Sequence, residues 1–80
     1  MDILERFEEC KNYGELEELV KTLSSEYLID VMYVTQDFAI PDEFGCWEMD
    51  IFEACWTELN NRGISNDEIK ACDIDLSWYA

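Results

Sequence analysis

Two pairs of neighbouring carboxylates, Glu48/Asp50 and Asp73/Asp75, are the groups in this sequence best suited to acid–base chemistry. General acid–base catalysis needs a side chain with a tuned pKa, and histidine, the most common choice, is absent. The four cysteines would lack the histidine base that normally activates a cysteine nucleophile. We therefore expect that the protein is not an enzyme, and a metal-dependent hydrolase built on Asp73 and Asp75 stays only as an alternative.

The cysteine spacing does not predict a metal site. No two cysteines have C-x-x-C spacing, so a zinc site would need all four thiolates to converge without close pairing. The segment 73–77 has the oxygen side chains of an EF-hand start, but Trp78 stands where such a loop needs glycine. We expect no metal and no cofactor, and we interpret the cysteines as small, reduced, buried thiols.

Net charge is the property that stands out. The 80 residues include 20 Asp and Glu against five Lys and Arg, which gives a formal charge of −15. A compact domain of this length is about 30 Å across, and duplex DNA carries roughly 18 charges over that distance. Such a surface attracts proteins that bind phosphate backbones and repels nucleic acid. We expect a nucleic-acid-binding protein as partner and no direct contact with nucleic acid.

The predicted partner-binding residues are carboxylates that share helix or strand faces, together with one tryptophan. Like charges at i, i+4 each destabilise a helix by about 0.2–0.5 kcal/mol, so this arrangement is not a stability optimum. Solubility alone and adaptation to salt are the two simpler explanations. Trp47 and Trp56, nine positions apart in one predicted helix, cannot both face the core, and an exposed tryptophan is a good interface residue. The predicted set is Glu5, Glu8, Glu9, Asp50, Glu53, Asp73, Asp75 and Trp47.

Apolar residues at helical spacing predict four helices, over about 2–11, 15–23, 47–61 and 66–72. A break is expected at Asn12-Tyr13-Gly14. The third helix should end at Gly63, in the left-handed position. Ser65-Asn66-Asp67-Glu68 matches a capping box and should start the fourth.

The segment 26–40 fits two structures. Alternating β-formers from Tyr27 to Thr35 favour a strand, whereas Ser24 or Ser25 would cap a helix over the same residues. We favour the strand, with a turn at Pro41 and a C-terminal strand in which Ile74, Leu76 and Trp78 alternate with polar residues. The prediction is one acidic α+β domain over 1–80, helix-rich with a minimal two-stranded sheet. The alternative is an all-α bundle.

Cytoplasmic localisation is expected. No apolar run reaches the 18 residues of a membrane span. The first residues, Met1 to Arg6, lack the basic and continuous apolar regions of a signal peptide. Reduced cysteines agree with that compartment.

In size and composition the chain resembles the small phage and mobile-element proteins that mimic DNA, namely anti-restriction and anti-CRISPR inhibitors. Two fragments, Asp37-Phe38-Ala39-Ile40-Pro41 and Asp73-Ile74-Asp75-Leu76-Ser77, resemble segments of the ArdA antirestriction family. The chain is about half the length of that family and lacks its N-terminal Gly/Trp pattern. No functional residue is carried over, and the resemblance implies only a DNA-mimic function.

The leading hypothesis is therefore a DNA-mimic inhibitor that binds a nucleic-acid-binding protein of a host defence system, restriction or CRISPR, in the host cytoplasm. The alternative is a protein–protein interaction module that binds a host partner through an exposed aromatic patch around Phe44, Trp47 or Trp78. A homodimer would double the length of the charged surface.

Overall fold

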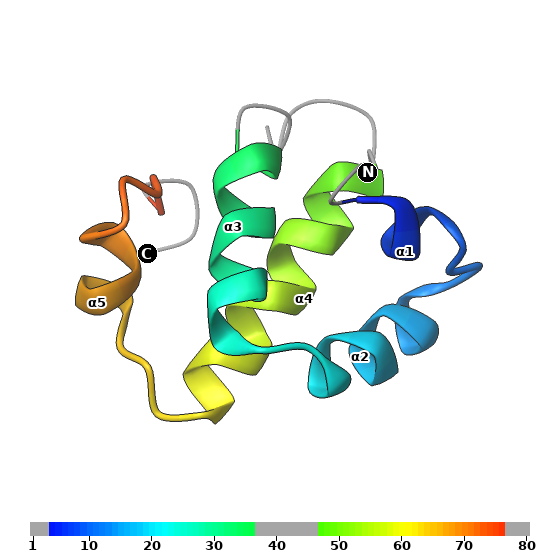
Figure 1. Cartoon of the computed structure of the whole chain (residues 1–80), viewed down its shortest axis with the longest axis horizontal. Coiled ribbons are helices and arrows are strands. Elements are labelled where there is room, and N and C mark those ends of the chain that lie inside the picture. The colour runs from blue at the N-terminus through cyan, green and yellow to red at the C-terminus, as the bar shows by residue number, and fades with distance from the viewer. Residues whose placement is uncertain (1–3, 37–46, 77–80) are drawn as a thin grey trace.

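The computed structural model describes residues 4–36 and 47–76, with the side chains of residues 47 and 48 left aside. These ranges contain five helices: α1 (Glu5–Glu8), α2 (Tyr13–Thr22), α3 (Ser25–Thr35), α4 (Trp47–Asn61) and α5 (Asn66–Lys70). Helices α3 and α4 run in opposite directions and pack on each other at the centre, and α2 also packs on α4 (Figure 1). α5 lies at one end of the long axis and α1 and α2 at the other (Figure 1).

One apolar core joins all five helices. Helical spacing places Leu16 and Val20 of α2 inside, and α3 and α4 each contribute a full apolar stripe. Contributions also come from the two ends of the described chain, with Phe7 in α1 and with Ile74 and Leu76 after α5. The buried apolar residues are Phe7, Leu16, Val20, Leu23, Leu28, Val31, Met32, Ile51, Phe52, Ala54, Cys55, Leu59, Ile69, Ile74 and Leu76.

The predicted α+β class is wrong, because residues 25–35 form helix α3 and no strand occurs in residues 4–36 and 47–76. The Ser24 hydroxyl accepts a hydrogen bond from the Tyr27 backbone N–H at 3.1 Å and so caps the helix. Tertiary packing supplies the rest, because Leu28, Val31 and Thr35 are completely buried along one face. The cap and the buried stripe outweigh the β preference of the individual residues. The described part fits the all-α alternative.

The C-terminal strand is also absent from the described residues, although the alternation that suggested it is real. Ile74 and Leu76 are buried and Asp75 is exposed. The segment has no strand partner because α3 is helical, and the Gln36 amide takes the partner's place. Its Nε2 donates to the Asp73 carbonyl at 3.0 Å, and its Oε1 accepts from the Asp75 N–H at 2.8 Å. One side-chain amide thus acts as a single residue of a neighbouring strand would.

The helix predicted over 47–61 is confirmed as α4, and its predicted end at Gly63 is confirmed as well. Gly63 has a φ of +88°, and its N–H and that of Ile64 bond to the Asn60 and Leu59 carbonyls at 3.0 and 3.1 Å. The predicted start of α5 at Ser65 is also confirmed, since the Ser65 hydroxyl accepts from the Glu68 N–H at 3.2 Å and donates to Glu68 Oε1 at 3.4 Å.

The N-terminal helices differ from the predicted boundaries. The helix expected over 2–11 is only the single turn α1 within the described residues. The break expected at 12–14 is the beginning of α2, because the Asn12 side chain accepts a hydrogen bond from the Glu15 N–H at 2.9 Å and serves as the N-cap. None of the described helices is long and apolar enough to cross a membrane.

Arg62 connects three helices from the end of α4. Its Nε donates to Glu58 Oε2 at 2.8 Å, and its Nη1 donates to the Ser25 hydroxyl at 3.0 Å. Its Nη2 donates to the Val20 and Leu23 carbonyls at 2.9 and 2.7 Å. A cation at the C-terminal end of α2 also complements the helix dipole. The guanidinium therefore fixes the α2–α3 connection against α4.

Candidate functional site

Acidic side chains from α2 and α4 meet around Tyr13, the first residue of α2. Partial burial raises the pKa of Tyr13, and the carboxylates of Glu53, Glu17 and Asp50 raise it further. Asp50 and Glu53 lie one turn apart on α4, and Glu17 lies one turn after Tyr13 on α2. These two helices pack on each other, so the carboxylates share one region of the surface. We call Glu17, Asp50 and Glu53 the α2–α4 acidic cluster.

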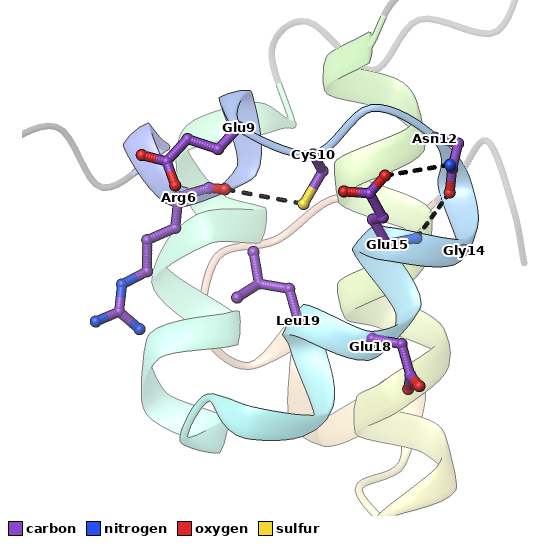
Figure 2. Close-up of a pocket in the computed structure, with 8 residues that line it drawn as sticks. All are labelled: Arg6, Glu9, Cys10, Asn12, Gly14, Glu15, Glu18 and Leu19. Carbon is purple, nitrogen blue, oxygen red and sulfur yellow. Dashed lines mark hydrogen bonds between the residues drawn. The ribbon is translucent and has the colours of Figure 1, made fainter.

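A second acidic region lies on the other side of α2. There α1, α2 and the turn between them line an open hollow of about 660 Å³. Figure 2 shows Cys10 and Leu19 directed into the space between the helices, with Arg6 and Glu18 extending outward at the edges. The remaining lining residues are Glu9, Asn12, Gly14 and Glu15. We call this concavity the α1–α2 hollow.

The hollow is negatively charged near its thiol. Partial burial raises the pKa of Cys10, and the carboxylates of Glu15 and Glu9 raise it further, which places both near the sulfur. The thiol donates weakly to the Arg6 carbonyl, with 3.8 Å between Sγ and O (Figure 2). A raised thiol pKa favours the protonated form, so Cys10 is a weaker nucleophile than an ordinary cysteine. The hollow is suited to receive a cationic group rather than to react.

Basic residues only partly offset these carboxylates. Lys21 pairs with Glu18 at 3.3 Å, but both side chains are largely exposed, and such pairs contribute little. Arg62 is engaged with Glu58 and with backbone carbonyls, so it does not interrupt the acidic surface. Arg6 and Lys11 are the cations that remain around the start of α2. The exposed or half-buried carboxylates there outnumber them, and they are Glu9, Glu15, Glu17, Asp50 and Glu53.

The predicted carboxylates divide between the two ends of the molecule. Glu5 and Glu8 in α1 and Glu9 just after it are exposed, and of these three Glu9 lines the hollow. Asp50 and Glu53 are half-buried and face α2. Glu15 and Glu17 are not among the predicted residues, although both are exposed on a helix that the sequence predicts. Their grouping with the α4 acids depends on tertiary packing, which the sequence pattern does not contain.

Asp73 and Asp75 do not join the other predicted residues. They follow α5, at the opposite end of the long axis from α1 and α2 (Figure 1). Asp73 has a φ of +65° and ends the turn after α5. Among residues 4–36 and 49–76, no group of three or more Cys, Asp or Glu side chains is arranged to hold a metal ion. The backbones of Asp73 and Asp75 bond to the Gln36 side chain, so this pair has a structural role in attaching the segment after α5 to the end of α3.

The predicted aromatic residues cannot be placed in the same way. The side chain of Trp47, together with Phe44, Trp78 and the segment around Pro41, lies outside the described residues. Trp56 is half-buried, and its Nε1 donates to Asn66 Oδ1 at 2.8 Å, so it stabilises the contact between α4 and α5. The exposed large apolar side chains of the described part are Tyr33 and Val34 on α3.

The cysteines have three different environments. Cys55 is fully buried in α4, and burial raises its pKa to about 12, as expected for an inert core thiol. Cys10 is half-buried, and Cys72, at the end of α5, is exposed. The interpretation as buried thiols is thus right for Cys55 and wrong for Cys72. Cys46 lies outside the described residues.

Comparison with known proteins gives no relative from which a function follows. No protein-family model, no curated protein and no solved structure matches this chain. The function is therefore inferred from where the chain's own side chains lie.

Proposed function

We propose that this protein inhibits a nucleic-acid-binding protein by presenting carboxylates in place of DNA phosphates. The observation that supports the proposal is the packing of α2 on α4, which brings Glu17 together with Asp50 and Glu53 near Tyr13, while Glu9 and Glu15 line the hollow on the other side of α2. The contact surface is centred on α2, with α1 and α4 beside it. Restriction and CRISPR components are the partner class we favour, since they bind DNA backbones through basic grooves.

The charge on this surface explains how binding would begin. Carboxylates gathered over two neighbouring helices raise the local negative potential and steer a basic groove toward this side of the molecule. Association would then be fast at low salt and would weaken with ionic strength, because exposed charges more than about 10 Å apart are screened at 0.1 M salt. The half-buried positions of Asp50 and Glu53 restrict their motion, so they lose little conformational freedom when a partner binds.

The proposal is tested by competition with duplex DNA. The protein is titrated into preformed complexes of labelled DNA with restriction enzymes and CRISPR effector complexes, at two salt concentrations. An active protein displaces the DNA, and the displacement weakens steeply as salt rises. No displacement from any complex of the panel, at low salt, would refute the proposal.

Matched variants locate the surface. The triple variant Glu17→Gln/Asp50→Asn/Glu53→Gln neutralises the α2–α4 acidic cluster with side chains of similar shape. The control Asp67→Asn/Glu68→Gln/Asp73→Asn makes the same charge change at exposed positions in and after α5. Losing three partly exposed ion pairs should raise the inhibitory concentration roughly tenfold, whereas the control should stay within about threefold. Equal losses would mean that net charge acts without a defined surface.

A further inference from the structure

A line of exposed side chains on α3 combines two carboxylates with an aromatic ring. Glu26, Asp30 and Tyr33 follow each other at i, i+4 and i+7, and Val34 lies beside them. All four are exposed, and they face away from the buried stripe through which α3 packs on α4. We call these four residues the α3 stripe.

The C-terminal half of the α3 stripe is apolar where a helix surface is normally polar. Tyr33 and Val34 keep 54% and 40% of their surface exposed, and they are the exposed large apolar residues of the described part. Adjacent exposed apolar side chains next to polar ones are a common feature of interaction sites. Tyrosine is also enriched among residues that dominate binding energy, because its ring buries a large area with little loss of conformational freedom.

The charge of α3 indicates what kind of partner would bind the α3 stripe. The helix SEYLIDVMYVT contains no Lys or Arg, and its last turn, where the helix dipole favours a cation, has none. Glu26 and Asp30 are like charges one turn apart, and no ion pair links either to a described residue. A positively charged group from outside would relieve this repulsion and interact with the end of the helix.

We propose that the α3 stripe binds a basic protein segment whose arginine stacks on the Tyr33 ring while Asp30 accepts its N–H groups. An arginine fits better than a lysine because its flat guanidinium stacks on an aromatic face and donates to a carboxylate at the same time. An apolar peptide would have to desolvate the two carboxylates without a partner, at considerable cost. The positive sign of the partner follows from the charges of α3 and agrees with the proposed function, to which the inference adds a second surface and an arginine preference.

Two peptides of equal length and charge, one arginine-rich and one lysine-rich, test this directly on the full chain by fluorescence anisotropy at low salt. The wild-type protein should bind the arginine peptide about two- to fivefold more tightly. Tyr33→Ala should remove that preference, and Tyr33→Phe, which keeps the ring, should retain it. Amide resonances of α3 should shift on addition of the arginine peptide, and circular dichroism checks that each variant keeps its helices.

The outcomes separate this inference from the proposed function. Equal affinities for the two peptides, or an arginine preference that survives Tyr33→Ala, would overturn the role of the α3 stripe and leave DNA competition unaffected. The triple variant of the α2–α4 acidic cluster should weaken both peptides alike and keep the preference. A DNA competition that fails while the Tyr33-dependent preference persists would refute the mimic and support the α3 stripe.

Discussion

Replacing Arg62 by alanine removes four hydrogen bonds in one step: three that reach α2, its C-cap and α3, and one to Glu58 within α4. The substitution leaves the Glu58 carboxylate without its cation. It also leaves the Val20 and Leu23 carbonyls at the end of α2 without this donor. We expect a large loss of stability from a residue that is not part of the apolar core.

The size of the loss follows from how accessible the pair is to water. The side chains of Arg62 and Glu58 are 24% and 14% exposed, so the pair lies between the surface and buried limits. Breaking a buried pair costs about 3–5 kcal/mol, and an exposed pair contributes about 0–1 kcal/mol. We therefore expect Arg62→Ala to lower the free energy of unfolding by about 2–3 kcal/mol, and Tm by roughly 8–24 °C for a domain of this size.

Urea denaturation followed by tryptophan fluorescence and by circular dichroism measures this loss. Lys11→Ala makes the same charge change at an exposed position outside the helices, and it should stay within about 0.5 kcal/mol of the wild type. Arg62→Lys keeps the charge but not the planar fork, so its loss should be intermediate. An Arg62→Ala protein as stable as Lys11→Ala would refute this account of how the helices are joined.

Three further outcomes can be measured. Gln36→Glu removes the donor to the Asp73 carbonyl and should lower the free energy of unfolding by about 1–3 kcal/mol in urea melts; an unchanged melt would contradict the role of this amide. The unfolding free energy should fall by about 1.4 kcal/mol between pH 8 and pH 10. In the unfolded chain the Cys55 thiol ionises near pH 9, whereas in the folded protein its pKa is about 12 and it stays protonated. Cys55→Ala should remove this component of the pH dependence. Ultraviolet titration should show Tyr13 ionising above the usual pH of a tyrosine, and Glu53→Gln should lower the pKa of Tyr13; an unchanged curve would place the carboxylate elsewhere.

Local patterns predicted the helices whose ends are written in the sequence. The apolar spacing of α4, Gly63 and the Ser65 capping box each act over a few residues, so they could be recognised without a structure. The prediction for residues 25–35 was wrong because tyrosine, valine and isoleucine are compatible with a strand. The Ser24 cap was noticed, but its weight against those preferences depends on α4 packing against the same residues.

The candidate site was predictable in residue type but not in grouping. Asp50 and Glu53 were expected on one face of α4, and the structure places them there. That Glu17 joins them, and that Asp73 does not, depends on which helices pack together. Charge patterns along one helix carry no information on that point.

The core has one consequence for how the protein is made. Phe7 and Leu76 belong to the same buried cluster, so the interior cannot close until synthesis has passed nearly the whole described chain. At the usual pace of translation this takes roughly 4–15 s, during which the apolar faces of α2, α3 and α4 are open to water. Nascent chains that stop before Ile74 lack the two buried apolar residues that follow α5 in the described part, and cellular proteases should remove them faster than the finished protein.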